Sequence, residues 1–253
     1  MSKRLLQLMV GLFAASGAYA QSAPATAPTA EVRHAHDMRW GRELFVLSEV
    51  LELAPSAEGA PLLFDLVAWY GGPVQRLWIT ADGSQVTRGT GSEVELQVMY
   101  GRLISPFFDV QVGALLEQAR AGGRTASRVG AVIGLQGLAP GWFEVEPRLA
   151  VNTKGNVSAD LTASYDLFIT QRLVLQPRLE ASAAFQPDPE FGTGTGLGAT
   201  SFGLRTRYEI QREFAPYVGV VWDRRYGSTA DLARAAGERA SEARLVLGLR
   251  LWY

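Results

Sequence analysis

The chain has no cysteine and only two histidines among its 253 residues. Without cysteine, neither disulfides nor thiolate metal sites can stabilise the protein or carry its chemistry. His34 and His36 both lie near the N-terminus, so a Ser-His nucleophilic site in the rest of the chain is excluded. No other positioned nucleophile or base is recognisable, and we therefore predict that the protein is not an enzyme.

Long apolar runs and an excess of positive charge are also missing. After the first 20 residues, no stretch approaches the run of about 18 apolar residues that indicates a transmembrane helix. The formal net charge is only -1, which excludes nucleic acid as a partner on electrostatic grounds. If the chain crosses a membrane, it must do so as a closed β-barrel, because only helices and closed barrels satisfy every backbone polar group in lipid.

The start of the chain predicts export from the cytoplasm. Lys3 and Arg4 precede an apolar run over residues 5–15, and the small-residue sequence Ala18-Tyr19-Ala20 follows. This order is typical of a signal peptide, which we place at residues 1–20. The apolar run is shorter than the roughly 20 residues that a membrane-spanning anchor helix needs.

Residues 21–41 differ in composition from both neighbouring regions. They are rich in Ala, Pro, Ser and Thr up to Ala30 and polar after it. We expect them to form a flexible periplasmic tail, since such a segment cannot bury enough apolar surface to fold.

From residue 42 to the end, apolar and polar residues alternate with the period of two that is typical of strands. We expect twelve strands, approximately at residues 42–53, 62–70, 75–81, 92–102, 107–117, 126–137, 142–151, 156–166, 171–183, 197–209, 214–223 and 243–253. Most approach the length of about 9 to 11 residues that crosses a bilayer at a tilt. The first and third strands match the pattern less well, so ten strands are the alternative.

The two faces of these strands suit lipid and a polar lumen. The predicted outward residues include Val94, Leu96, Val98, Phe143, Val145, Leu149, Leu173, Leu175, Leu179, Phe202, Leu204 and Tyr208. The predicted inward residues include Glu93, Glu95, Gln97, Glu144, Glu146, Arg148, Gln176, Arg178, Glu180, Ser201, Arg205 and Arg207. This pattern predicts an all-β fold, a transmembrane antiparallel up-and-down β-barrel over residues 42–253. Its lumen can be either open or plugged.

The predicted connections differ in length between the two ends of the barrel. With the N-terminus in the periplasm, the periplasmic turns are short, as at residues 71–74 and 210–213. The outer connections are mostly longer, including residues 82–91, 118–125 and 224–242, and the segment 230–243 favours a short helix. Short turns at one rim and longer loops at the other are typical of bacterial outer-membrane barrels.

Aromatic residues supply a further indication of a membrane location. Eleven of them fall at strand ends beside the predicted periplasmic turns: Tyr70, Tyr100, Phe107, Phe108, Trp142, Phe143, Tyr165, Phe168, Tyr208, Phe214 and Tyr253. They would form an aromatic girdle at the inner interface. The alternative is a soluble β-sandwich with these aromatics in its core, but a sandwich would not need every short turn at one rim.

One short cluster in the tail has metal-ligand chemistry. His34, His36, Asp37 and Met38 bring two imidazoles, a carboxylate and a thioether together within five residues. Imidazole suits copper, and a thioether favours its reduced ion. We predict that these four residues bind a copper ion; the alternative is a chance polar cluster in a disordered tail.

The barrel region resembles the copper resistance protein B family of bacterial outer-membrane proteins. The matching stretches are Gly134-Leu135-Gln136-Gly137-Leu138-Ala139-Pro140, Trp142-Phe143-Glu144, Tyr165-Asp166, residues 170–178, Gly203-Leu204-Arg205, Arg207-Tyr208-Glu209, residues 212–219, Ala230-Asp231 and Ala236-Gly237-Glu238. The match as a whole covers the chain from about residue 42 to its end, and it is densest in the second half.

The resemblance implies a barrel in the bacterial outer membrane that takes part in copper homeostasis. Its partners would be outer-membrane lipid, copper ions and periplasmic copper-handling proteins. Members often carry an N-terminal region rich in Met and His, whereas the tail of this chain holds one methionine, Met38, after the predicted signal peptide. Two functions remain open. One is a barrel that binds or passes copper ions, with lumen carboxylates attracting cations. The other is a passive narrow porin or structural barrel without copper selectivity.

Overall fold

The computed structural model describes residues 41–54, 61–86, 91–121 and 123–253. The predicted signal peptide, the cleavage site and all but the last residue of the predicted tail lie outside these ranges. No helix within the described ranges is long and apolar enough to cross a membrane.

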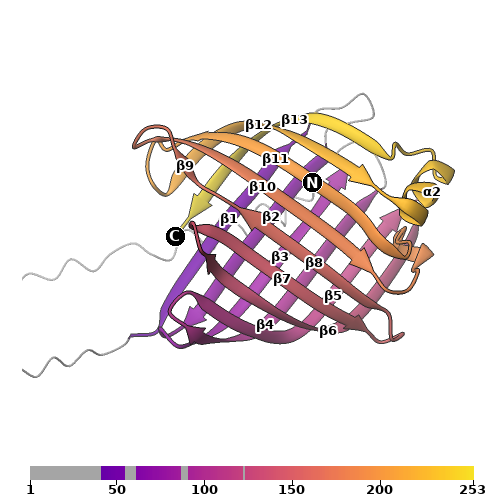
Figure 1. The fold of residues 1–253 in the computed structure, drawn as a ribbon, viewed down its shortest axis with the longest axis horizontal. Helices are drawn as coiled ribbons and strands as arrows, with labels where there is room; N and C mark the ends of the chain where they lie inside the picture. Colours follow the sequence, from indigo (N-terminus) through magenta and orange to yellow (C-terminus); the bar gives the residue numbers. More distant parts are fainter. Residues whose placement is uncertain (1–40, 55–60, 87–90, 122) are drawn as a thin grey trace, which may run out of the picture. The chain divides into compact units, whose positions relative to one another are not determined.

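Twelve antiparallel strands form a closed barrel, which confirms the larger of the two predicted strand numbers (Figure 1). The strands are β1 (Glu43–Leu53), β2 (Pro61–Gly71), β3 (Gln75–Val86), β4 (Ser92–Ser105), β5 (Phe108–Ala121), β6 (Arg124–Ala139), β7 (Phe143–Asn152), β8 (Val157–Ser164), β10 (Leu173–Ala184), β11 (Gly196–Tyr208), β12 (Phe214–Arg225) and β13 (Ser241–Trp252). A two-residue strand, β9 (Leu167–Phe168), extends the wall beside β10. Pairing of β1 with β13 and of β10 with β11 closes the ring of the twelve long strands.

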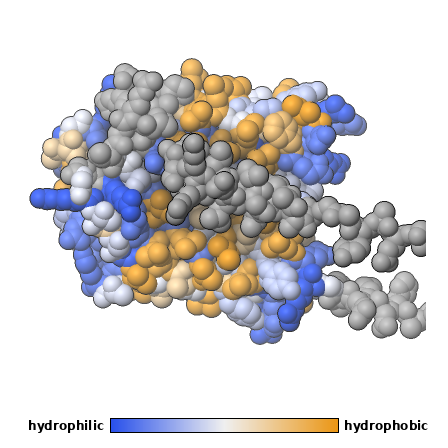
Figure 2. Space-filling model, turned by 180° about the vertical axis from the view of Figure 1, so that it is seen from behind, coloured by the Kyte–Doolittle hydropathy of each residue, from blue (hydrophilic) through white to orange (hydrophobic). Residues whose placement is uncertain are grey.

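The alternation of side chains sorts the barrel into an apolar exterior and a mainly polar interior. On β4, Val94, Leu96 and Val98 are exposed, whereas Gln97 and Met99 between and beside them are buried. The face seen in Figure 2 carries hydrophobic residues across its middle and hydrophilic residues mainly toward the ends. Apolar side chains exposed around a closed barrel fit a hydrocarbon environment, because there they are kept out of unfavourable contact with water.

The predicted aromatic girdle lies on the exterior. Nine of its eleven members are exposed: Tyr70, Tyr100, Phe107, Trp142, Phe143, Phe168, Tyr208, Phe214 and Tyr253. Phe108 and Tyr165 are half-buried. Exposure of so many rings is the opposite of what a β-sandwich core would require, and it argues against that alternative.

Two predicted outer connections, residues 82–91 and 118–125, need correction because the strands beside them are longer than expected. Residues 82–86 belong to β3, residues 118–121 to β5 and residues 124–125 to β6, although all were assigned to outer loops. The Asp82-Gly83 pair reads as a turn in sequence. In the structure Gly83 is part of a strand, where a Cβ atom would lie 2.2 Å from the carbonyl oxygen of Glu93.

The longest connections lie at one end of the barrel. The β12–β13 connection contains α2 (Gly227–Ala235), which confirms a helix in this loop but places its start three residues before the predicted one. The β10–β11 connection contains the short helix η1 (Pro189–Phe191). The α2 end and the C-terminus lie at opposite ends of the barrel (Figure 1). Because outer-membrane barrels have their longer loops outside the cell, we expect the α2 end to be the extracellular one.

Candidate functional site

A cavity of about 590 Å³ occupies the lumen toward the α2 end. Among the described residues, its lining includes twelve carboxylate side chains and seven arginines, and no lysine or histidine. The lining includes Val67, Thr80 and Arg178 from the strands, and Arg239 from the β12–β13 connection. The cavity therefore has an excess of negative charge, which raises the local concentration of cations.

Four of these carboxylates form a row around the barrel wall. Asp65 on β2 pairs in register with Asp82 on β3. Asp82 in turn pairs with Glu95 on β4, and Glu95 pairs with Glu117 on β5. Directly opposite side chains on neighbouring strands have Cβ atoms about 4.5 to 5.5 Å apart, and like charges at that spacing are destabilising. We call Asp65, Asp82, Glu95 and Glu117 the carboxylate row.

Arginines neutralise the two ends of the carboxylate row. Arg178 Nη2 donates to Asp65 Oδ2 at 2.8 Å. Arg128 Nη2 donates to Glu117 Oε1 at 2.5 Å, and Arg128 also pairs with Asp188 at 3.2 Å. Within the described ranges no salt bridge reaches the two central members, Asp82 and Glu95. The negative charge of the row is therefore concentrated at its centre.

Arg178 and a further lumen arginine, Arg205, also pair with carboxylates outside the row. Arg178 contacts Glu49 at 3.2 Å and Glu180 at 2.6 Å, in addition to Asp65. Arg205 Nε donates to Glu52 Oε1 at 2.5 Å, and the Glu52 side chain is almost fully buried. Because these guanidinium groups are already paired, they leave little free positive charge to repel a cation or attract an anion.

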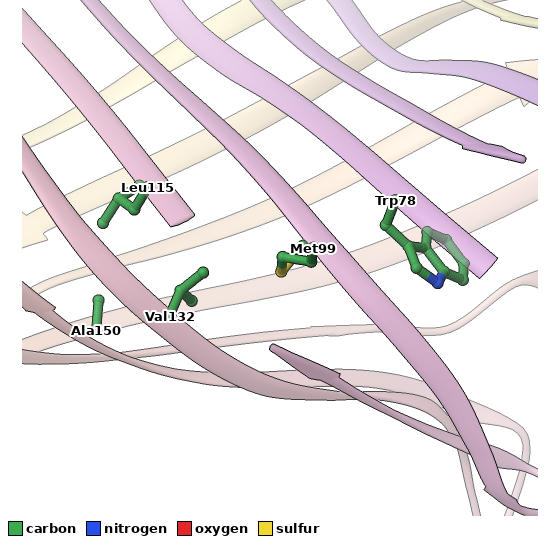
Figure 3. Close-up of a cluster of buried hydrophobic side chains, with 5 residues drawn as sticks. All are labelled: Trp78, Met99, Leu115, Val132 and Ala150. Carbon is green, nitrogen blue, oxygen red and sulfur yellow. The ribbon is translucent and has the colours of Figure 1, made fainter. Parts of the chain in front are cut away.

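An apolar layer lies beneath the cavity. Its buried members are Trp78, Met99, Leu115, Val132 and Ala150, shown in Figure 3, and Val67 and Trp69 pack against them. Met99 is fully buried and Val132 is only 2% exposed. These residues come from inward positions of β3 to β7, so the layer lies within the barrel. We call this set the apolar floor. It shows that apolar side chains cover the inner face of β3 to β7 on the other side of the cavity from α2.

Arg76 holds the periplasmic side of the apolar floor in place. Its Nη1 donates to Asp109 Oδ2 at 3.0 Å and its Nε donates to the Gly72 carbonyl oxygen at 3.3 Å. Its guanidinium lies 4.7 Å from the ring centroid of Trp69 and 5.9 Å from that of Trp78. Such cation–π contacts hold the Arg76 guanidinium and the two indole rings in position relative to one another.

The predicted copper ligands in the tail, His34, His36, Asp37 and Met38, lie outside the described residues, so the structure does not place them. Within the described ranges, no three side chains of His, Cys, Asp or Glu come close enough together to hold a metal ion. The inward orientation predicted for Glu95, Arg148 and Arg178 agrees with their position at the cavity.

Sequence reasoning missed part of this site. The sequence predicts a loop at Asp82, whereas the structure places it in β3. The partners within the carboxylate row depend on the register between strands, which the alternation within one strand does not reveal. The sequence does contain a signal that β3 continues past residue 81, because Trp78, Thr80, Asp82 and Ser84 form an unbroken series of inward positions. The Asp82-Gly83 pair obscured it.

Comparison with known proteins places the chain in a family. The family model of the copper resistance protein B precursor (CopB) matches residues 42–253. The chain is 41% identical over 209 residues to the copper resistance protein B homolog of Pseudomonas syringae pv. tomato, covering 83% of this chain and 69% of that protein. It belongs to the copper resistance protein B family. The Escherichia coli copper resistance protein B is 36% identical over 208 residues, covering 82% of this chain and 69% of that protein.

A solved porin structure supports the barrel fold of this CopB-family chain. The NanC porin superposes with a TM-score of 0.50 at 12% identity, covering 83% of this chain and 99% of that chain. The KdgM porin has a TM-score of 0.48 at 11% identity, covering 82% and 98%. With its apolar exterior and closed sheet, the protein is a bacterial outer-membrane β-barrel of a family involved in copper resistance.

Proposed function

We propose that this CopB-family barrel binds copper ions in its acidic lumen and takes part in their passage across the outer membrane. The observation that carries the proposal is the cavity, whose carboxylates outnumber its arginines. An excess of fixed negative charge between low-dielectric walls concentrates cations and disfavours anions. Family membership supports copper as the cation.

We further propose that the tail supplies a capture site at His34, His36, Asp37 and Met38. Neutral imidazoles are strong copper ligands, and the Asp37 carboxylate and Met38 thioether can complete the coordination. A tail that captures copper in the periplasm would also meet periplasmic copper-handling proteins. Here the tail would hold the ion, and the lumen would attract it electrostatically.

Replacing both His34 and His36 by Ala is expected to weaken copper binding to the tail by at least about tenfold, because the imidazoles are its strongest neutral ligands. Calorimetric titration of the mature, refolded chain with copper(II) sulfate measures this. The matched control carries Thr26→Ala and Thr29→Ala, which change the same tail without removing a strong ligand. Equal affinity of the histidine variant and the control would contradict the tail site.

The apolar floor favours a second candidate, a structural or narrow barrel without copper selectivity. A buried layer of Trp78, Met99 and Val132 limits passage, because hydrophobic constrictions exclude water and ions. Copper titration and conductance measurements in planar bilayers together separate the two functions. Tight, copper-preferring binding supports the first, whereas conductance without metal preference supports the second.

Trp78→Ala tests whether the apolar floor restricts the lumen. Removing this ring is expected to raise the single-channel conductance in planar bilayers several-fold, because a buried indole of the floor is lost and water can enter. The control is Trp222→Ala on the exterior, where the exposed indole is 48% accessible and lies outside the lumen. If both variants conduct like the parent protein, the floor is not the constriction.

A further inference from the structure

The inward positions of β3 and β4 form a ladder of potential cation ligands. Three consecutive cross-strand pairs occupy it: Asp82 with Glu95, Thr80 with Gln97, and Trp78 with Met99. The first pair faces the cavity and the last belongs to the apolar floor. A cation that enters from the cavity would therefore meet two carboxylates before it reaches the packed layer.

The first pair carries charge that its surroundings do not balance. Asp82 and Glu95 stand at the centre of the carboxylate row, and the salt bridges of the row lie at its two ends. Glu95 accepts a hydrogen bond from the Gln97 amide nitrogen, which orients that carboxylate without neutralising it. Two adjacent carboxylates of this kind repel each other, and a bound cation would relieve the repulsion.

The second pair offers buried oxygen atoms that have no partner. Thr80 is 4% exposed and Gln97 is 3% exposed. Neither Thr80 Oγ1 nor Gln97 Oε1 has a hydrogen-bond partner within the described part of the chain. Thr80 lines the cavity. A buried polar atom without a partner costs about 1 to 3 kcal/mol, so these atoms indicate a missing ligand.

We propose that Asp82, Glu95, Thr80 Oγ1 and Gln97 Oε1 form a binding station for a partly hydrated divalent cation. Carboxylate, hydroxyl and amide oxygens are ligands for such ions, and an ion that keeps several waters does not need three carboxylates around it. The choice of copper(II) as the bound cation rests on the proposed function, in which copper is the ion that the barrel binds and passes. For a given donor set, copper(II) is also the divalent first-row ion that binds most tightly.

The double substitution Asp82→Asn and Glu95→Gln tests the station in the full mature chain. That chain also carries His34→Ala and His36→Ala, so that the tail does not contribute. Copper(II) and manganese(II) binding are followed separately by electron paramagnetic resonance. We expect at least tenfold weaker binding of both ions, with copper(II) bound more tightly than manganese(II) by the parent. The matched control, Glu43→Gln with Glu213→Gln, removes two exposed carboxylates that do not line the cavity and should bind like the parent.

A second variant separates ligation from folding. Thr80→Val keeps the shape of the side chain and removes the unpartnered hydroxyl, so the metal-free barrel should be at least as stable. Its divalent affinity should nevertheless fall several-fold. A difference in electrophoretic mobility between unheated and heated samples verifies that each variant is a folded barrel. A Thr80→Val barrel that folds normally and binds both ions like the parent would contradict the role of this hydroxyl.

The outcomes distinguish the station from the proposed function. One outcome is that the parent binds manganese(II) as tightly as copper(II) and the double substitution abolishes this binding. That result supports the station and contradicts the copper function. Tight copper(II) binding that the double substitution leaves unchanged supports the function and overturns the station. If the histidine-free parent binds neither ion, the station is overturned.

Discussion

Replacing Leu247 by Arg is expected to block assembly of the barrel in the membrane. Leu247 lies in the middle of β13, is 56% exposed and pairs in register with Val218, which is 50% exposed. Both side chains are on the lipid-facing exterior. An arginine at the bilayer midplane of an outer-membrane barrel costs about 2 to 4 kcal/mol. Folding into lipid vesicles, followed by heat-modified migration on gels, measures the loss.

Ala243→Arg is the matched control for Leu247→Arg. It places the same side chain on the same face of β13, but close to the outer end of the strand. The cost of a charge falls to about 0 to 1 kcal/mol near the interface, so this variant should assemble almost normally. If the two variants assemble equally well, Leu247 does not face the hydrocarbon.

Replacing Arg178 by Met is expected to destabilise the barrel by up to about 3 to 5 kcal/mol, because it removes the buried partner of three partly exposed lumen carboxylates. Arg178 is 8% exposed and holds Glu49, Asp65 and Glu180. Methionine fills much of the same space, so loss of charge rather than of volume dominates. Urea-dependent unfolding in lipid vesicles, followed by tryptophan fluorescence, gives the change in the free energy of unfolding.

Two comparisons verify the role of Arg178. Arg234→Met removes an exposed ion pair with Asp231 on α2, a kind of pair that contributes only about 0 to 1 kcal/mol. Adding Glu49→Gln and Asp65→Asn to Arg178→Met should recover part of the lost stability, since it removes the uncompensated charges. A triple variant as unstable as Arg178→Met alone would show that packing, rather than charge, makes Arg178 important.

Most of the barrel could be predicted because its signal is local. The period-two alternation arises within each strand, from the opposite preferences of lipid and lumen for neighbouring side chains. The exposed Val94, Leu96 and Val98 of β4 therefore have a clear origin in the sequence. The strand number followed in the same way, although the Asp82-Gly83 pair hid the end of β3.

Register could not be predicted in this way, because it joins residues that are distant along the chain. Arg178 and Asp65 meet across the lumen although 113 positions separate them. Sequence reasoning could identify both as polar and could predict that Arg178 points inward, but it could not pair them.

The amino-acid sequence thus accounts for the all-β class, the twelve strands and the direction in which their side chains point, since each depends on neighbours two residues away. The carboxylate row, its unbalanced centre at Asp82 and Glu95, and the apolar floor beneath it arise when the sheet closes. Closure sets which inward residues share a level of the lumen, and electrostatic attraction depends on that spatial proximity rather than on sequence order.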